Sequence, residues 1–412
     1  MTSRTSPTAR HSLALLLSLL TCFVGCDGTE APLDASDPGE GGSGDPSALR
    51  REVLGALGEN VILPTLREFA TQAEALEAAA DAYAADPSDE SRAAAQAAWR
   101  DAAASWQQAE LMQVGPAGMA GTGCGVVGAM ELRDEIYSWS LTSTCRIDQE
   151  TVAETHADPA LLDAELVNVR GLDAMEYLLF VETDDNTCGA LSPINDAGTW
   201  EAERANIRQR RATYAHTAAQ LVLEEARGLR DAWEPSGGDF LADWRGAGTD
   251  GSAYDTSQRA LDDLATAMLY LDNATRDMKV GDPAGITCMD ASCIDSLETP
   301  FANHDKEAVL ANLEAFGRLF HGESPDSMGL GIDDLLLAIG ADALVADLGA
   351  ALTAATEAVE AIPGTLREAI EADAPEVMAA YAALGTAQRL FKVDVVTALD
   401  IDVQSCTPGD ND

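Results

Sequence analysis

Apolar residues recur along most of the chain at spacings of three and four positions, while alternating runs of β-branched residues are nearly absent. Such spacing places apolar side chains on one helix face, so it predicts an all-α fold. Alanine is abundant and aromatic residues make up only 5% of the chain, which indicates close packing through small side chains. The expected helices cover residues 47–83, 91–114, 159–181, 199–233, 254–280, 332–339, 341–361, 364–372 and 375–399.

Between these helices, residues 115–160 and 182–198 are expected to form loops, apart from a short amphipathic piece at 131–139. The string Glu234-Pro-Ser-Gly-Gly238 opposes helix continuation and is the best domain boundary. A chain of 412 residues is also long for a single core. We therefore predict two helical-bundle domains packed side by side, over residues 47–235 and 239–412.

The N-terminus has the pattern of a secretory signal peptide over residues 1–26. Arg4 and Arg10 precede an apolar run that is too short for a membrane span. Gly25 and Cys26 end this run and resemble the bacterial lipobox, which predicts lipidation of Cys26; secretion with simple cleavage nearby is the alternative. Residues 27–46 are rich in Gly, Asp, Ser and Pro, so they are expected to form a flexible tether.

Six cysteines remain after the signal segment, and an even number in an exported protein favours disulfides. Cys288 and Cys293 lie in one predicted loop and are expected to pair with each other. A bond between Cys124 and Cys145 would tie the preceding loop, which would leave Cys188 with Cys406, although spacing alone cannot choose among the pairings. The six candidates are Cys124, Cys145, Cys188, Cys288, Cys293 and Cys406.

The formal net charge of −45 argues against nucleic acid or an anionic lipid surface as a partner of the folded part. Contact with a membrane is therefore expected only through the lipid anchor. A solvated acidic surface explains most of this charge, and the charge is also compatible with cation binding.

Two carboxylates fall within the apolar face of the predicted helix at 159–181. Asp173 and Glu176 are three residues apart, and they share an arc with Leu172, Met175 and Leu179. Burying an unpaired carboxylate costs several kcal/mol, so the pair requires a proton, a cation or a basic partner. The two residues are therefore candidate site residues.

The string Gly171-Leu-Asp-Ala-Met-Glu-Tyr-Leu-Leu-Phe180 resembles the Gly-x-His-x-x-Glu motif of the imelysin-like proteins, with Asp173 in place of the histidine. Weaker similarities follow in the family's order, among them Glu298-Thr-Pro-Phe301, and the resemblance covers most of residues 50–412. The family comprises bacterial envelope proteins first named for an insulin-cleaving protease and related to a periplasmic iron-uptake component. The resemblance implies two helical bundles with a site between them.

The resemblance also implies that positions 173 and 176 are metal ligands. With Asp173 the pair is all-oxygen, which favours harder cations such as iron(III), calcium or manganese over zinc or copper. Two carboxylates alone do not make a site. The upstream candidates for further ligands are Glu131, Asp134 and Glu110, and the downstream candidates are Glu298 and His304.

Three interpretations of the motif compete with a metal site. In the first, Asp173, which lies at the edge of the apolar arc, is a surface residue. In the second, Glu176 pairs with an arginine such as Arg133 or Arg170. In the third interpretation, the metal site has decayed and the fold serves as a scaffold.

The preferred functional prediction is a lipid-anchored envelope protein, on the periplasmic or outer-membrane face, that binds a metal ion or metal complex in iron uptake. The alternatives are a metallopeptidase of the imelysin type and a non-catalytic scaffold. The sequence contains neither His-Glu-x-x-His nor Gly-x-Ser-x-Gly, which disfavours the peptidase.

Overall fold

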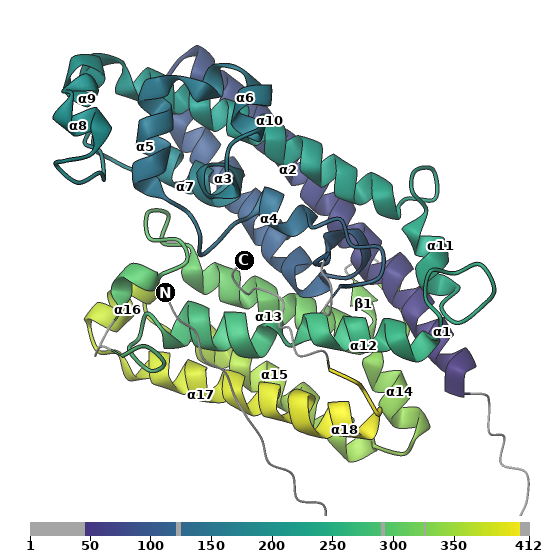
Figure 1. The fold of residues 1–412 in the computed structure, drawn as a ribbon. Coiled ribbons are helices and arrows are strands. Elements are labelled where there is room, and N and C mark those ends of the chain that lie inside the picture. Colours follow the sequence, from purple (N-terminus) through teal and green to yellow (C-terminus); the bar gives the residue numbers. More distant parts are fainter. Residues whose placement is uncertain (1–45, 121–124, 290–292, 325–326, 404–412) are drawn as a thin grey trace, which may run out of the picture. The chain divides into compact units, whose positions relative to one another are not determined.

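The computed structural model describes residues 46–120, 125–289, 293–324 and 327–403, and these fall within one compact unit, Gly44–Asp412 (Figure 1). The predicted signal peptide with Cys26, and the tether up to residue 45, lie outside the described residues. Cys124 and Cys406 lie outside them as well.

Helices of ten residues or more form the framework of the described chain: α1 (Pro46–Leu57), α2 (Leu63–Ala85), α3 (Asp89–Ala109), α5 (Thr144–Ala153), α7 (Gly171–Phe180), α10 (Ile207–Trp233), α12 (Ser257–Met268), α13 (Asp305–His321), α15 (Asp342–Glu360) and α17 (Pro375–Arg389). The shorter ones are α4 (Leu132–Ile136), α6 (Pro159–Asp163), α8 (Pro193–Asp196), α9 (Thr199–Glu203), α11 (Phe240–Arg245), α14 (Ile332–Ala338), α16 (Leu366–Glu371) and α18 (Val396–Ala398).

Wider π-helical turns extend three of these helices: η1 (Gly58–Ile62), η7 (Leu271–Gly281) and η9 (Leu390–Val395). The 3₁₀ turns are η2 (Glu110–Met112), η3 (Gly115–Ala117), η4 (Thr155–Ala157), η5 (Val167–Val169), η6 (Arg204–Asn206) and η8 (Ile294–Ser296). Within the described ranges, strand pairing is limited to β1 (Glu323–Ser324) with β2 (Ser327–Met328). The predicted all-α class is confirmed.

Two groups of helices are visible in the packing (Figure 1). In the first group, α2 packs on α3 and α10, and α10 packs on α7. In the second group, α15 packs on α13 and α17, and η7 also packs on α13 and α17. Helix α13 also packs on α3, and α1 packs on α12, so one apolar core runs from Val53 to Ile401. The predicted division of the chain between residues 235 and 239 stays a prediction.

Most of the helical pattern predicted from the sequence is confirmed. The first helix runs without a break through α1, η1 and α2, and the four predicted helices after residue 331 are present with small shifts at their ends. Helix α5 was not predicted, because its buried face carries Asp148, Glu150 and Thr151 beside Ile147 and gives no apolar periodicity. It begins after Ser143, whose hydroxyl accepts the N–H of Arg146.

The single helix predicted over residues 159–181 is wrong, because the chain breaks before the motif. Gly171 has φ +85°, a left-handed conformation that disfavours residues with a Cβ. A Cβ on Gly171 would also lie 2.8 Å from the carbonyl oxygen of Ile136. Arg170, in extended conformation, is the N-cap of α7, which therefore starts at Gly171 and brings its first turn against the end of α4.

The disulfides differ in part from those expected. Cys288 and Cys293 are bonded, as predicted. Cys145 is bonded to Cys188, so the expected pairs Cys124–Cys145 and Cys188–Cys406 are both wrong. The bond joins α5 to the segment after α7, and this connection depends on a helix that the apolar pattern does not reveal.

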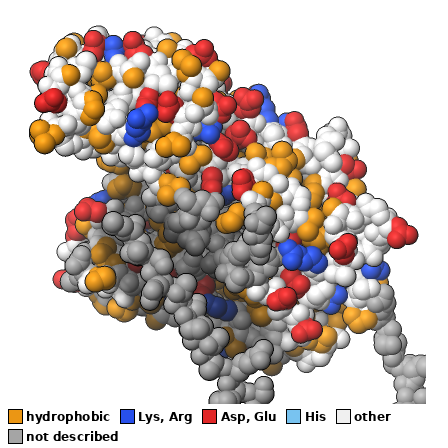
Figure 2. All heavy atoms as spheres, viewed as in Figure 1, with side chains coloured by type: hydrophobic (Ala, Val, Ile, Leu, Met, Phe, Trp, Pro, Cys, Tyr) orange, Lys and Arg blue, Asp and Glu red, His pale blue; other side chains and the backbone are white. Residues whose placement is uncertain are grey.

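On the face shown in Figure 2, acidic and apolar side chains are interspersed rather than gathered into one patch. None of the helices in the described part of the chain combines the length and apolar character that crossing a bilayer requires.

We expect Gly171→Ala to lower the free energy of unfolding by about 1–3 kcal/mol, because alanine would be forced into a left-handed conformation against Ile136. Thermal unfolding followed by circular dichroism measures the change. Gly317→Ala is the matched control, since Gly317 lies inside α13 with nothing within 4 Å of a Cβ position. We expect this control to stabilise by up to about 1 kcal/mol, and a similar response in both variants would contradict the backbone argument.

We expect the double variant Cys145→Ser, Cys188→Ser to lose about 2–4 kcal/mol of stability, because the bond closes a loop with a sequence separation of 43. The pair Cys288→Ser, Cys293→Ser closes a separation of only 5 and should lose less. Denaturant unfolding of both variants provides the comparison. An equal or larger loss from the short loop would show that loop length does not decide the effect.

Candidate functional site

Asp173 lies in the first turn of α7 and is 5% exposed. Its Oδ2 accepts the hydroxyl of Ser138 at 2.8 Å and the hydroxyl of Thr142, and its Oδ1 accepts the backbone N–H of Ser138 at 3.4 Å. Burial raises the pKa of Asp173, and the hydrogen bonds from Thr142 and Ser138 oppose that rise. The carboxylate therefore fixes the segment between α4 and α5, and both of its oxygens already have protein donors.

Glu176 follows one turn later, is 4% exposed and faces the segment before α13. Its Oε1 accepts the backbone N–H groups of Phe301 and Ala302 at 2.8 and 2.7 Å. Burial raises the pKa of Glu176 well above its ordinary value, and the charges of Asp305 and Asp173 raise it further. Its Oε2 accepts no hydrogen bond from the described residues, so this oxygen is available to a ligand.

The arginine partners proposed for Glu176 are engaged elsewhere, so that interpretation is wrong. Arg170 pairs with Glu135 at 2.6 Å and with Asp163 at 2.7 Å. Arg133 pairs with Asp134 at 2.8 Å. The surface interpretation of Asp173 is also wrong, because the side chain is buried.

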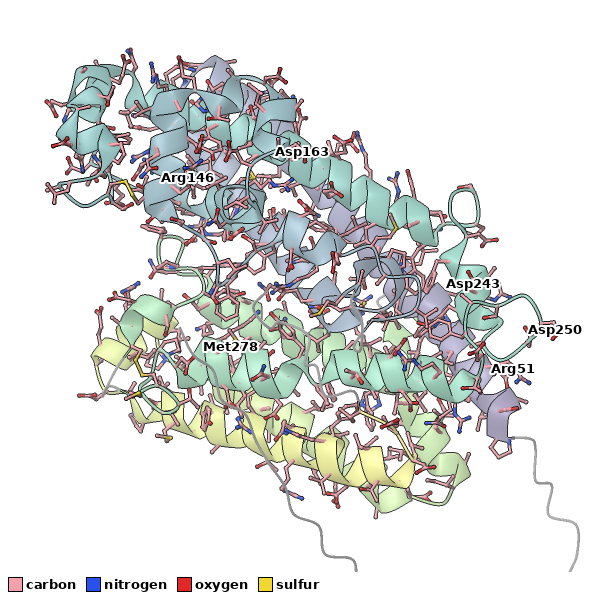
Figure 3. The ribbon with its side chains drawn as sticks, viewed as in Figure 1. Arg51, Arg146, Asp163, Asp243, Asp250 and Met278 are labelled. Atoms are coloured by element: carbon pink, nitrogen blue, oxygen red, sulfur yellow. A yellow bond between two sulfur atoms is a disulfide. The ribbon has the colours of Figure 1, made fainter. Side chains whose placement is uncertain are left out.

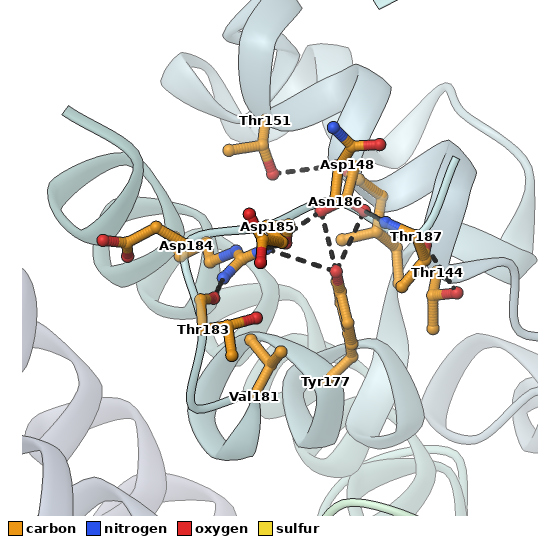
Figure 4. A network of polar contacts seen from close by, with 12 residues as sticks. Thr144, Asp148, Thr151, Tyr177, Val181, Thr183, Asp184, Asp185, Asn186 and Thr187 are labelled. Atoms are coloured by element: carbon orange, nitrogen blue, oxygen red, sulfur yellow. Dashed lines mark hydrogen bonds and ion pairs between the residues drawn. The ribbon is translucent and has the colours of Figure 1, made fainter. Parts of the chain in front are cut away.

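Tyr177 connects the motif helix to a second polar network (Figure 4). Its hydroxyl lies 2.9 Å from both oxygens of Asp148, which also accepts the backbone N–H of Thr187 at 2.8 Å. Arg211 lies 3.2 Å from Asp148 and donates to the carbonyl oxygen of Thr183 at 2.6 Å. Cys188, which directly follows Thr187, is bonded to Cys145 of α5. The network and the disulfide together hold α5, α7, α10 and the segment 183–188 in contact.

A buried charge cluster lies next to the motif helix and centres on Lys279 of η7, which is fully buried. Its Nζ lies 3.0 Å from Oε1 of Glu298 and 3.3 Å from Oε2 of Glu110, and it also contacts Gln107. Tyr137 donates its hydroxyl to Oε1 of Glu298 at 2.8 Å. The sequence analysis did not single out Lys279. The chain has only three lysines, and the position of this one between Met278 and Val280 is a sequence signal for a buried, paired charge.

A cavity of about 640 Å³ is open beside these groups. Three aromatic side chains, Trp139, Tyr177 and Phe301, line it together with Met278, which is labelled in Figure 3. The charged lining residues are the carboxylates Asp173, Glu176, Asp282, Asp295 and Glu298 and the guanidinium of Arg367. The volume suits a small molecule or a metal complex, and the excess of carboxylates favours a positively charged ligand.

Among the predicted ligands, the structure brings Asp173, Glu176 and Glu298 to this cavity. Glu131 and Asp134 line a separate small pocket, where Glu131 accepts the backbone N–H of Ala120 at 3.2 Å. The reason is local: the helix α4 that follows Glu131 directs these two residues toward residues 113–119.

The other two candidates also lie away from the cavity. Glu110 belongs to the Lys279 cluster, and His304 packs edge-on to Trp99, where burial lowers its pKa. Within the described ranges, no group of three or more His, Cys, Asp or Glu residues is close enough together to hold a metal ion.

The sequence matches the family described as Imelysin over residues 62–392. The structure of an iron-regulated protein A precursor from Parabacteroides distasonis has a TM-score of 0.66 and 17% identity, covering 87% of this chain and 97% of that one. An imelysin-like protein from Psychrobacter arcticum gives a TM-score of 0.63 and 17% identity, covering 87% and 98%. A comparison with curated protein sequences finds no match. Since the family match spans most of the sequence, this chain belongs to the imelysin family.

Proposed function

We propose that this protein is a bacterial envelope lipoprotein that binds a metal complex in the cavity beside α7, with iron as the first candidate and a role in iron uptake. Family membership and the lipobox pattern ending at Cys26 support the envelope location. The Parabacteroides distasonis protein is described as iron-regulated, which supports iron over calcium.

The observation that carries the proposal is the number of carboxyl groups that line the cavity wall. Five carboxylates line the cavity, and one of them, Glu298, is paired with the buried ammonium of Lys279. The other four are opposed by the single guanidinium of Arg367, which itself donates to Asn303 at 3.2 Å and to the carbonyl oxygen of Pro300 at 3.3 Å. Burial raises the pKa of Glu176 and of Asp173, so their negative charges are costly in an empty cavity. A cation that entered would remove that cost.

The residues fit a metal that keeps most of its own ligands and do not fit a bare ion. Asp173 already satisfies both oxygens with Ser138 and Thr142, and Glu176 offers one oxygen. Hard cations bind six or more oxygens, which these side chains do not supply. A volume of about 640 Å³ leaves room for water or a chelator around the metal.

A scaffold without a metal site is the second candidate, and one observation favours it. In a scaffold, Asp173 would act only as the acceptor that fixes residues 138–142, which its hydrogen bonds allow. Metal retention separates the two candidates.

We expect mature protein from Asp27 onward to retain about one equivalent of metal after dialysis at moderate salt, and Glu176→Gln to retain none. Fe²⁺ kept reduced, Mn²⁺ and Ca²⁺ are the probes, each supplied as the hydrated cation, and elemental analysis gives the stoichiometry. Glu357→Gln is the control, because it removes the same charge from the exposed face of α15. Equal retention by wild type and Glu176→Gln would indicate surface binding, and no retention by wild type would favour the scaffold.

We expect Glu176→Gln to stabilise the metal-free protein increasingly as the pH rises. In the folded state the pKa of Glu176 lies well above its ordinary value of 4.5, so below about pH 4.5 the group is protonated in both states and contributes nothing. Above that pH the unfolded chain releases the proton while the folded chain holds it, and the wild type loses stability. Glutamine keeps the acceptor for Phe301 and Ala302 without the charge.

The measurement is the melting temperature of both proteins between about pH 4.5 and pH 8 in buffer with a chelator. The two curves should coincide at the acid end and separate by a few degrees at neutral pH, whereas Glu357→Gln should show no such separation. A variant less stable than wild type at neutral pH would mean that the folded protein needs the charge.

A further inference from the structure

Apolar side chains line part of the cavity beside its carboxylates. Trp139, Met278, Leu297, Pro300 and Phe301 belong to this apolar part and come from three separate segments of the chain. Met278 and Phe301 are only partly buried, so their side chains reach the open space. An apolar surface accepts no hydrogen bond, so coordinated waters that faced it would leave their O–H groups unpaired. The lining therefore favours a ligand with an apolar organic part.

The ring of Phe301 is held by contacts on both sides of its own backbone. Glu176 accepts the N–H of Phe301 at 2.8 Å, and Arg367 donates to the carbonyl oxygen of the preceding residue, Pro300, at 3.3 Å. The ring meets Tyr177 edge-on, with 5.1 Å between the ring centroids. Phe301 is therefore a preorganised contact surface beside the carboxylate of Glu176.

Polar contacts of neighbouring residues fix the other two large apolar side chains. Met278 precedes Lys279, which is fully buried and ion-paired, so the chain has little freedom at this point of η7. Trp139 follows Ser138, whose hydroxyl donates to Asp173 at 2.8 Å. Nζ of Lys279 also lies 5.7 Å from the centroid of the Trp139 ring. The contacts that place the carboxylates thus place the apolar lining as well.

We propose that the cavity is built for an organic metal chelate, which it binds in preference to a hydrated ion. The positive centre of the chelate faces Glu176. A ring of the chelator packs against Phe301, Met278 and Trp139. The inference rests on the proposed function and adds the chemical class of the ligand, a cationic complex with at least one apolar, ring-bearing donor group.

The size of the cavity agrees with this class of ligand. One water takes about 30 Å³, so a hydrated ion with six waters takes roughly 200 Å³, whereas the cavity holds about 640 Å³. A hydrated ion would therefore leave most of the volume to water, including water against the apolar side chains. An organic ring in that volume would remove apolar surface from water and add a ring–ring contact.

Two cobalt(III) complexes that differ by one ring test the proposal, hexaamminecobalt(III) and pentaammine(pyridine)cobalt(III). Both carry three positive charges and exchange their ligands slowly, so the ratio of their dissociation constants isolates the contribution of the ring. Isothermal titration calorimetry at moderate salt measures both constants. We expect wild type to bind the pyridine complex at least about fivefold more tightly than the hexaammine complex.

Phe301→Leu removes the ring and keeps the backbone N–H for Glu176, so we expect the preference to fall to within about twofold. Met278→Ala is measured beside it, because it tests the same wall without a change in the segment before α13; its preference should also fall. Met378→Ala is the matched control, since Met378 is 56% exposed on α17, and it should keep the wild-type preference. Circular dichroism checks that each variant is folded.

The outcomes separate this inference from the proposed function. Equal affinity of wild type for the two cobalt complexes would overturn the inference, and so would a wild-type preference in every folded variant of Phe301 and Met278. Retention of a hydrated metal ion without a preference for the pyridine complex would leave the proposed function intact. Failure of wild type to bind any of the metal probes would overturn both.

Discussion

The buried ammonium of Lys279 is the constraint on which the arrangement of the cavity depends. A charge with no exposure must be paired, because leaving it alone in the interior costs several kcal/mol. Its partners Glu110 and Glu298 come from segments far apart in the sequence, so η7, the end of α3 and the segment before α13 must meet at one point. Tyr270 adds a hydroxyl to Glu110 and completes the pairing.

The same constraint reaches the motif helix through neighbouring residues. Tyr137 donates to Glu298, and the next residue, Ser138, donates to Asp173. Gly171 allows α7 to start against Ile136, immediately before these two. The position of α7 relative to the charge cluster is thus set by three consecutive residues, and Glu176 then faces the loop that also carries Glu298.

The sequence pattern was sufficient for most helices and for the buried pair Asp173 and Glu176, because apolar periodicity reports which face of a helix is buried. It was insufficient where polar contacts decide the structure. Helix α5 buries Asp148 against Tyr177 and Arg211, so it lacks an apolar stripe, and the Cys145–Cys188 bond could not be inferred without it. The break at Gly171 depends on a contact with Ile136, which sequence spacing does not show.

The sequence pattern was also insufficient to choose among the candidate ligands, because their positions depend on polar contacts. Glu131 and Asp134 carry carboxylates like Glu298, so residue type gave no reason to prefer one of them. Their positions depend on how α4 turns and on which carboxylate Lys279 draws inward. The oxygen of Glu298 that lacks a donor becomes visible only when every neighbour of the carboxylate is placed.

The hydrogen bonds of Asp173 bear on the difference between this chain and the Gly-x-His-x-x-Glu pattern that its motif resembles. Asp173 offers two acceptor oxygens to the hydroxyls of Ser138 and Thr142 and to one backbone N–H. A neutral histidine offers one acceptor nitrogen, so it would leave at least one of these donors unpaired in the interior. Ser138, Thr142 and Asp173 therefore form one hydrogen-bonded unit, in which a change at position 173 alters what the other two residues require.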